Sequence, residues 1–282
     1  MTPAIAWRPA WPTSWPLVNR AVERLRDGVE DALGARLVGR YLCGSLALGG
    51  FDRGSSDIDV LVATARMPPQ PAIERLAALH AALRAAGGWT ARLEAVYLPV
   101  ATLRRYDPAD RRRYPIGASD RELALGGQAP TWVLDRWIAR EHGLVVAGPS
   151  PRTLIDPIAP AQLRAAARAN LLEFWAGQLD GPDPAWLRPR NYQAFAVLSL
   201  CRALYCLDHG EVVSKPAAAA WASRRFDPPW PELVARALSW RADPHPDDDG
   251  LADTLRLVAD ATARARARTA EPTGGRPCGA RR

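Results

Sequence analysis

The sequence predicts an α+β protein in which a mixed sheet with packed helices is followed by an all-helical bundle. Before about residue 157, short apolar runs suited to strands alternate with amphipathic stretches of helical length. Beyond it the chain is rich in alanine and leucine with helical periodicity. At 282 residues with 48% hydrophobic content, the chain is long enough for two domains. We expect domains at 1–157 and 158–268, then a disordered basic tail at 269–282.

In the first part, helices and strands are expected to alternate. One amphipathic stretch, 16–33, ends at a glycine, and a second, 72–86, ends at a glycine pair. Residues 101–130, which carry two arginine clusters, are expected to be mostly loop. The other expected helix covers 131–141, and the strands cover 37–43, 59–63, 90–100 and 143–148. In the second part the expected helices cover 160–178, 190–208, 214–225, 229–241 and 249–268.

Charge distribution and cysteine content limit the classes of binding partner and the cellular location that we expect. Residues 264–282 hold six arginines and one glutamate, which accounts for +5 of the net charge of +7. The nearly neutral body disfavours a nucleic-acid groove. No apolar run reaches the length of a membrane span, no export signal is evident, and the four cysteines have neither metal-ligand nor disulfide spacing. We expect a cytoplasmic protein. The sequence does not determine its oligomeric state, and a monomer is the simplest expectation.

The central motif combines a glycine-serine turn with paired aspartates. Gly44 and Ser45 follow the expected strand 37–43, and their backbone N–H groups could cradle a phosphate. Asp57 and Asp59 stand two residues apart at the head of the next apolar run, so both project to the same face. Paired carboxylates repel each other unless a cation lies between them, and hard oxygen ligands suit Mg²⁺. The motif predicts metal-assisted phosphoryl or nucleotidyl transfer, although paired aspartates also occur where they only solvate a strand end.

This motif resembles that of the nucleotidyltransferase superfamily: a glycine-serine pair, a gap of about ten residues, and then Asp57-x-Asp59 followed by apolar residues. Glu94 lies within the apolar strand expected next, where a carboxylate is costly unless it has a partner or a role. The resemblance implies that Glu94 completes the metal site with Asp57 and Asp59. In the antibiotic-modifying members, it also implies that Glu94 is the general base on the acceptor hydroxyl. The alternative is a glutamate on the solvent face of an edge strand.

Two cations in the helical half fit a phosphate site. On the helix 190–208, Arg202 falls on a stripe with Phe195, Leu198, Tyr205 and His209 that we expect to face the core, where a guanidinium needs an anion. Lys215 is the single lysine among 37 basic residues and follows a good N-cap, Ser214. A lysine in a first helical turn opposes the helix dipole unless an anion binds there.

The segments Leu198–Arg202, Gly210–Lys215 and Ala220–Ala222 resemble the C-terminal domain of the aminoglycoside (streptomycin/spectinomycin) adenylyltransferase family. The resemblance implies that Arg202 and Lys215 contact the phosphates of ATP across an interdomain cleft, with Gly44 and Ser45 on the other side. It also implies that Trp175 contacts the acceptor substrate. The acidic residues expected before the Arg202 helix are not evident, and Arg188 and Arg190 stand there instead, which disfavours a strongly cationic acceptor.

The resulting hypothesis is an adenylyltransferase that transfers AMP from ATP, with Mg²⁺, to a hydroxyl group of a small molecule. The resemblance implies an aminoglycoside or aminocyclitol acceptor such as streptomycin or spectinomycin. Three alternatives stay open at this point. A nucleotidyltransferase acting on an RNA or protein hydroxyl would share the catalytic residues. A non-catalytic nucleotide-binding regulatory protein need not keep all three carboxylates, and a helical interaction protein would explain only the second half.

Overall fold

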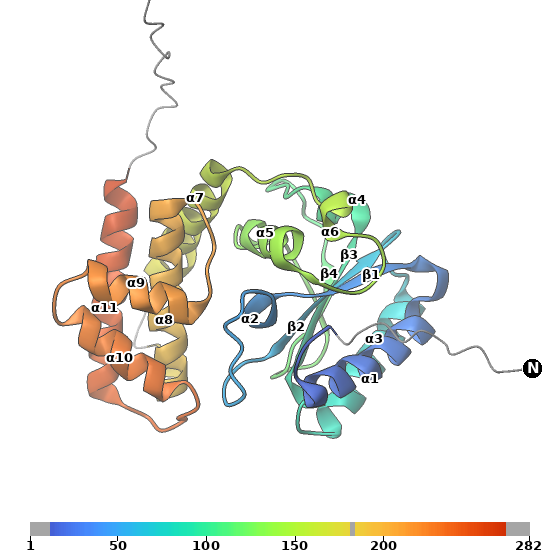
Figure 1. Cartoon of the computed structure of the whole chain (residues 1–282), viewed down its shortest axis with the longest axis horizontal. Helices are drawn as coiled ribbons and strands as arrows, with labels where there is room; N and C mark the ends of the chain where they lie inside the picture. Colours follow the sequence, from blue (N-terminus) through green and yellow to red (C-terminus); the bar gives the residue numbers. More distant parts are fainter. Residues whose placement is uncertain (1–11, 181–183, 269–282) are drawn as a thin grey trace, which may run out of the picture.

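A computed structural model describes residues 12–180 and 184–268 and contains one mixed sheet beside a group of helices (Figure 1). The six strands lie in the order β5-β4-β3-β2-β1-β6. The neighbours β2 and β3 are parallel, and every other neighbouring pair is antiparallel. The α+β class is therefore confirmed. The strands are β1 (Leu37–Leu42), β2 (Ile58–Thr64), β3 (Leu93–Pro99), β4 (Tyr114–Gly117), β5 (Ala124–Gly126) and β6 (Leu144–Ala147).

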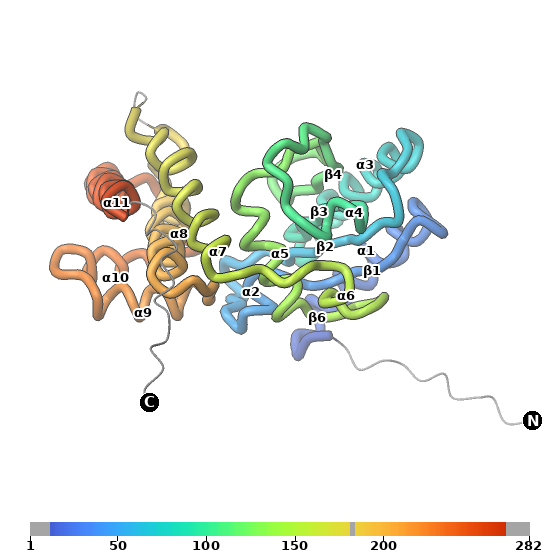
Figure 2. Tube along the Cα trace, turned by 90° about the horizontal axis from the view of Figure 1, so that it is seen from above, coloured from blue at the N-terminus to red at the C-terminus, as the bar shows by residue number. Residues whose placement is uncertain are grey.

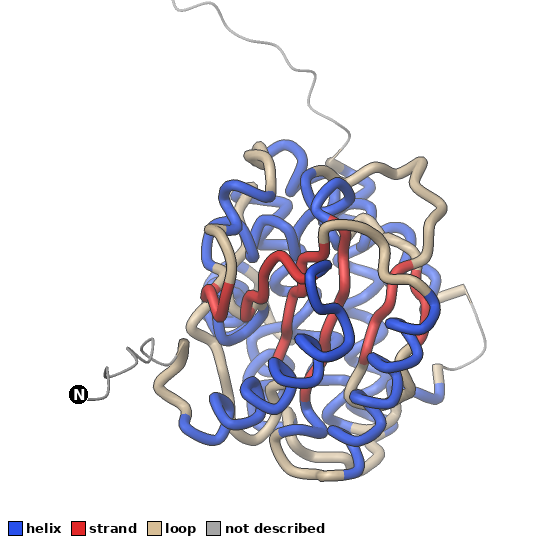
Figure 3. The backbone as a smooth tube through the Cα atoms, turned by 90° about the vertical axis from the view of Figure 1, so that its right-hand side faces the viewer, coloured by secondary structure: helices blue, strands red, loops and turns tan. Residues whose placement is uncertain are grey.

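Strand alternation gives the sheet two different faces. Val60 and Val62 of β2, with Ala95 of β3, belong to an apolar core that also includes α1 and α3. Leu61 and Leu98 point to the opposite face and pack with residues of α4, α5 and α6. The strands thus lie between two layers of helices (Figure 3). These helices are α1 (Pro16–Leu33), α3 (Gln70–Ala85), α4 (Val100–Arg104), α5 (Trp132–His142) and α6 (Pro151–Leu154).

The expected loop at 101–130 is the main error in the predicted secondary structure. It contains most of α4 and both strands of the β4–β5 hairpin, which extends the sheet beyond β3. These strands are only four and three residues long, too short for a strand period to emerge from the sequence. The arginines there bind nearby carboxylates: Arg104 and Arg105 pair with Asp156, and Arg112 pairs with Asp110.

The helical region is built around α8, which contacts α7, α9, α10 and α11. Its core combines buried alanines and leucines of these helices, as the composition predicted. The helix expected at 160–178 continues from α7 through a π-helical segment, Asn170–Trp175, and a 3₁₀ turn, Ala176–Gln178. The α-helices of this region are α7 (Pro160–Ala169), α8 (Arg190–His209), α9 (Lys215–Arg225), α10 (Trp230–Trp240) and α11 (Asp248–Ala267).

The helical region lies to one side of the sheet region, and α5 and α7 lie where the two meet (Figure 2). Val133 and Ile138 of α5 pack there with Leu163 of α7, Cys206 of α8 and Val212. This shared apolar cluster holds the two regions in a defined orientation. The division at residue 157 remains a prediction, and the expected disordered tail lies outside the described residues. None of the described helices is both long and apolar enough to cross a membrane.

Candidate active site

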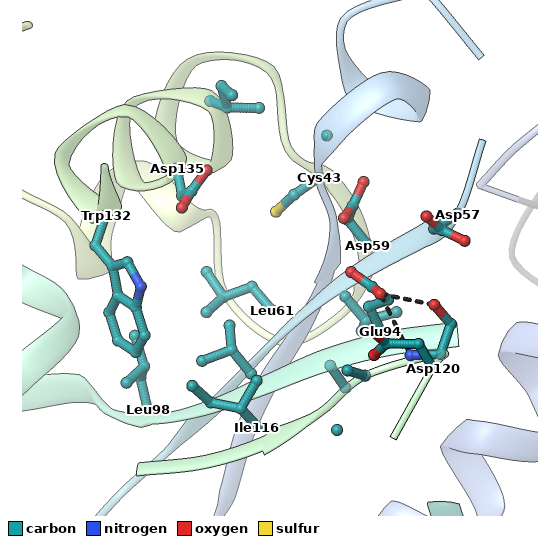
Figure 4. Close-up of a pocket in the computed structure, with 18 of the residues that line it drawn as sticks. Cys43, Asp57, Asp59, Leu61, Glu94, Leu98, Ile116, Asp120, Trp132 and Asp135 are labelled. Atoms are coloured by element: carbon teal, nitrogen blue, oxygen red, sulfur yellow. Dashed lines mark hydrogen bonds between the residues drawn. The ribbon is translucent and has the colours of Figure 1, made fainter. Parts of the chain in front are cut away.

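Three carboxylates meet on the face of the sheet that looks toward α5. Asp59 of β2 is the register partner of Glu94 of β3, and Asp57 precedes β2. The close-up in Figure 4 shows the three side chains together at one end of a cavity. None of them has an ion-pair partner within 4.0 Å among the residues that the structure describes. The sequence prediction that the chain brings Glu94 beside the paired aspartates agrees with this arrangement.

Burial and mutual repulsion make this cluster electrostatically unfavourable on its own. Burial, then repulsion from Glu94 and Asp59, raises the pKa of Asp57 to about 6. Burial and repulsion from Glu94 also raise the pKa of Asp59, although Lys215 and Arg202 partly offset this. A raised carboxyl pKa means that the ionised form is destabilised where it stands. The site therefore favours a ligand that brings positive charge.

The glycine-serine turn packs directly against Asp59. Gly44 begins a short helical turn, α2 (Gly44–Ala47), with φ +53°. A Cβ atom added at Gly44 would lie 1.8 Å from Asp59 Oδ2, so a side chain at this position would overlap the carboxylate. The backbone amide of Ser45 hydrogen-bonds Asp59 and lowers its pKa against the larger effect of burial. In this structure the Ser45 amide thus faces a carboxylate, whereas the sequence predicted a phosphate cradle.

The helical region supplies three cations to the opposite wall: Arg202 of α8, Lys215 at the start of α9, and Arg241 after α10. Lys215 Nζ lies 4.5 Å from the centroid of the Phe195 ring. Burial, then repulsion from Arg202, lowers the pKa of Lys215 to about 8, while Asp59 raises it. An anion bound near Lys215 would raise its pKa again, so the side chain would then stay protonated and positively charged.

The stripe that holds Arg202 faces the core only in part, which corrects the sequence prediction. Leu198 is buried in the core of the helical region and Tyr205 packs against it, whereas the other members of the stripe do not belong to that core. Phe195 is 43% exposed, His209 is also exposed, and Arg202 is half-buried. Phe195, Leu198 and Arg202 line the cleft. A helix beside a cleft presents apolar and charged residues at the spacing that a core-facing helix uses, so periodicity alone does not separate the two.

The two walls touch at the mouth of the cleft. A Cβ atom added at Gly50, in the loop after α2, would lie 2.6 Å from Ser214 Cβ. Ser214 caps α9 by accepting a hydrogen bond from the Ala217 amide, as predicted. Arg241 Nη2 lies 3.5 Å from Ser56 Oγ, and Arg241 Nη1 lies 3.9 Å from Asp52 Oδ2. Residues from both regions thus enclose one site. Arg241 lies after an apolar helix, where the sequence carries no motif, and the sequence analysis missed it.

The cleft has two lobes that share Gly44, Asp57, Asp59, Glu94, Asp135, Ile138 and Phe195. The first, called the cationic lobe, has a volume of about 300 Å³. The second, called the apolar lobe, lies between the sheet and α5 and has a volume of about 580 Å³ (Figure 4). The residues that characterise the cationic lobe are Ser45, Ser56, Arg202, Ser214, Lys215 and Arg241. Those that characterise the apolar lobe are Leu61, Val96, Leu98, Leu103, Ile116 and Trp132.

Asp135 is a second residue that the sequence analysis missed. It lies on α5, one turn after Trp132, and its side chain is exposed to the cleft between the two lobes. Desolvation of the carboxylate inside the cleft raises the pKa of Asp135 to about 6; Arg202 lowers this pKa and Asp59 raises it further. Asp135 stands in the first turn of a helix that also carries Arg136, Arg140 and Glu141, so in the sequence it resembles an ordinary solvent-facing position and gives no distinctive signal.

Trp175, predicted to contact the acceptor, is not at the cleft. Its side chain is 2% exposed and lies in the core of the helical region. This corrects the prediction: the aromatic residues that line the apolar lobe from the helical region are Trp186, Tyr192 and Phe195. The expectation that Arg188 and Arg190 repel a cationic acceptor is also corrected. Arg188 pairs with Asp248, and Arg190 pairs with Asp243 and Asp247, so their charges are balanced outside both lobes.

Of the three carboxylates, Asp57 and Asp59 fit a hard divalent cation better than Glu94 does. Among the described residues, no group of three or more His, Cys, Asp or Glu side chains is arranged to hold a metal ion. Asp57 and Asp59 nevertheless offer carboxylate oxygens on one face without a cationic partner, and these oxygens suit Mg²⁺. Glu94 differs because its Oε1 accepts hydrogen bonds from Ser119 Oγ at 2.8 Å and from the Ser119 amide at 3.3 Å.

The site combines carboxylates on adjacent parallel strands, a glycine-serine turn, and cations from a helical region that face them across a cleft. This combination is that of the nucleotidyltransferase class. Residues 153–266 match the family described as aminoglycoside adenylyltransferase, C-terminal domain. The helical half of the chain thus matches the model of an aminoglycoside adenylyltransferase domain, and the relatives described next extend the similarity to the sheet region.

Similar proteins span both regions of the chain. A spectinomycin 9-adenylyltransferase of Staphylococcus aureus is 28% identical over 213 residues, which cover 72% of this chain and 77% of the relative. An aminoglycoside (3'') (9) adenylyltransferase of Rhizobium radiobacter is 27% identical over 234 residues, which cover 78% of this chain and 81% of the relative.

A solved spectinomycin adenyltransferase from Enterococcus faecialis, crystallised with ATP and spectinomycin, has a similar fold. It superposes with a TM-score of 0.67 at 14% identity, over 88% of this chain and 98% of its own. At this identity the likeness concerns the fold, which is shared across both the sheet and the helical region.

Proposed function

We propose that this chain transfers AMP from ATP to a hydroxyl group of an aminoglycoside or aminocyclitol antibiotic such as spectinomycin or streptomycin. The observation that carries the proposal is that three carboxylates and three cations line one cleft, in a chain whose residues 153–266 match an aminoglycoside adenylyltransferase domain. Its relatives named for spectinomycin and aminoglycoside adenylylation support the acceptor class. The described cysteines are free thiols, which agrees with work in the reducing, ATP-rich cytoplasm.

In this proposal the triphosphate lies in the cationic lobe. Arg202, Lys215 and Arg241 would bind its oxygens and stabilise the charge that grows on the leaving pyrophosphate. Gly44 leaves room for the backbone to approach, and the Ser45 side chain lines the same lobe. Asp57 and Asp59 would hold Mg²⁺, with Glu94 beside them, and the bound metal would neutralise phosphate charge and orient the phosphates.

Glu94 is proposed to accept the proton of the acceptor hydroxyl. The hydroxyl oxygen then forms a bond to the α-phosphorus while the bond from that phosphorus to the pyrophosphate oxygen breaks. Ser119 engages Oε1 of Glu94, so Oε2 is the oxygen free to take the proton. The hydrogen bonds from Ser119 fix the carboxylate so that its second oxygen points in one direction, which is what a general base needs.

The proposal is tested by incubating the purified chain with Mg²⁺, ATP labelled in its α-phosphate, and a panel of aminoglycosides and aminocyclitols. We expect label to appear on spectinomycin or streptomycin with release of pyrophosphate. Glu94→Gln keeps the shape and the hydrogen bond to Ser119 but removes the base, and it should lower kcat by about 10²–10⁴-fold. Absence of label on every member of the panel, with ATP still bound, would rule out this acceptor class.

A further inference from the structure

The apolar lobe begins where the carboxylates end. On β2 the residue two places after Asp59 is Leu61, and on β3 the residues two and four places after Glu94 are Val96 and Leu98. These side chains share one face of the sheet, because strand residues two apart point the same way. Along this face the surface therefore changes from charged to apolar within one strand step. A molecule whose hydroxyl reaches Glu94 from this side rests its remaining atoms beside Val96.

The floor and roof of the lobe are apolar where a ligand can reach them. Val96 is the register partner of Ile116 on β4, and both keep accessible surface. Leu61, Leu98 and Leu103 lie beneath them and are buried. Trp132 of α5 covers the other side, and Figure 4 shows it across the cavity from Ile116. A volume of about 580 Å³ with mostly apolar walls is typical of a small-molecule site.

The helical region closes the lobe with exposed aromatic rings. Trp186 is 37% exposed, Tyr192 is 44% exposed, and Phe195 is 43% exposed. Trp186 and Tyr192 form an edge-to-face pair with ring centroids 5.9 Å apart, and Trp186 Nε1 donates to Gln178 Oε1 at 3.0 Å. Exposed aromatic side chains gathered around one cavity, and held in place by such contacts, provide faces on which a ring can stack.

The lobe offers little charge to a cationic ligand. The Arg136 guanidinium donates to the backbone carbonyls of Leu103, Thr102 and Trp132 and keeps its positive charge, which repels a cationic ligand. At the rim, Asp120 lies 3.5 Å from Arg121, so their charges offset each other. Asp135 is the carboxylate that remains, apart from Asp57, Asp59 and Glu94 at the reaction centre. Each further positive charge brought into the lobe would be desolvated without a partner, which is costly.

The order of the two lobes follows from the chemistry. In an in-line displacement, the attacking oxygen and the leaving pyrophosphate lie on opposite sides of the phosphorus. If pyrophosphate leaves into the cationic lobe, the acceptor approaches from the other side of the carboxylates, which is the apolar lobe.

Resting on the proposed function, we propose that the apolar lobe binds the acceptor through an uncharged ring face. The acceptor of this chain is then a compact ring system with few positive charges, and an extended polycation is a poor substrate. Val96, Ile116, Trp132 and Tyr192 determine this specificity by contact with the ring, and Asp135 accommodates one of the acceptor's ammonium groups.

The test compares AMP transfer to spectinomycin, a compact fused-ring aminocyclitol, with transfer to streptomycin, which carries two guanidinium groups. Wild type, Val96→Phe and Tyr192→Ala are assayed, with Tyr192→Phe as the matched control that keeps the ring. We expect wild type to prefer spectinomycin. Val96→Phe fills the lobe and Tyr192→Ala removes a wall, so each should lower kcat/KM for spectinomycin by about tenfold or more. The KM for ATP should stay within about twofold in all variants, and Tyr192→Phe should behave as wild type.

A preference of wild type for streptomycin, or an unchanged kcat/KM for spectinomycin in both Val96→Phe and Tyr192→Ala, would overturn the inference. A rise in the KM for ATP in these variants would also overturn it, because it would place adenine in the lobe. Calorimetry with each antibiotic separates this inference from the proposed function. Spectinomycin binding that Val96→Phe weakens, without any transfer, supports the lobe assignment and rejects the activity. Binding of neither compound rejects both.

Discussion

The two lobes of the cleft use opposite chemistry although they share one group of carboxylates. The cationic lobe collects Arg202, Lys215 and Arg241 from three different helical elements, and the apolar lobe is lined mainly by side chains of β2, β3, β4 and α5. The cations all come from the helical region and the three carboxylates come from the sheet region, so opposite charges face each other only where the two regions meet. An apolar wall needs only an accessible patch of an existing core. Affinity for ATP therefore depends on how the two regions meet, whereas acceptor selection depends on the sheet region and on the aromatic residues Trp186, Tyr192 and Phe195.

The shared carboxylates carry the largest expected effect. Asp59→Asn should lower kcat by about 10³-fold or more, because Asp59 is proposed to hold the metal whose charge stabilises the transition state. Chelation of Mg²⁺ should abolish AMP transfer in the same assay. The thermal midpoint should stay the same or rise, because the substitution removes repulsion from Glu94. Transfer within tenfold of wild type would remove Asp59 from the catalytic site and leave the two lobes without a common centre.

The cationic lobe should respond to pH through Lys215. Because its pKa is lowered to about 8, the ammonium is charged below that pH and loses its charge as the pH rises through it. We therefore expect kcat/KM for ATP to fall by up to about tenfold per pH unit above pH 8 in wild type. Lys215→Arg keeps its charge and should remove this alkaline decline. An identical decline in both proteins would assign the titration to another group.

The same shift affects stability with a different sign. The folded pKa of Lys215 lies below its ordinary value of 10.5, so the unfolded chain binds more protons between about pH 8 and 10.5. The contribution of Lys215 to the free energy of unfolding therefore rises with pH in that interval. Chemical denaturation at several pH values, with Lys215→Met as the control without an ionisable group, measures this contribution.

A smaller effect distinguishes two roles for Arg241. As a phosphate ligand, Arg241→Gln should raise the KM for ATP by about three- to tenfold, the size expected of a partly screened ionic contact. If Arg241 acts only by linking the two regions through Asp52, then Asp52→Asn should have the same effect. We expect Asp52→Asn to leave the KM for ATP unchanged or lower it, because Arg241 is then free to bind phosphate.

The smallest effect on activity is expected at Trp175. Since this side chain is 2% exposed in the helical core, Trp175→Phe should leave the KM for every acceptor unchanged. It should lower the free energy of unfolding by about 1–3 kcal/mol, as other core truncations do. A rise in acceptor KM without loss of stability would instead support the contact that the family resemblance implied, and it would weaken the distinction between the lobes.

The residues that could be found from the sequence are those whose charge conflicts with their surroundings. Asp59 belongs to a pair of carboxylates that repel each other at the head of an apolar strand, Glu94 interrupts an apolar strand, and Lys215 opposes a helix dipole. Each therefore needed a ligand or a partner to explain it. Asp135 and Arg241 could not be identified as site residues because neither charge conflicts with the sequence pattern of the helix it belongs to or follows. Trp175 was misplaced because an aromatic residue in an amphipathic helix has the same signature whether it faces a core or a ligand.

By itself, the sequence determined the α+β class, most of the helices and strands, and the pairing of a carboxylate motif with Arg202 and Lys215. These features depend on local periodicity and on charges that are costly to bury, and both are visible along the chain. Only the tertiary structure decided that Arg202 faces a cleft, that Arg241 and Asp135 join it, and that an apolar lobe opens beside Glu94. An apolar side chain beside a cavity and one inside a core look alike in sequence, because the difference lies in what the rest of the chain leaves uncovered.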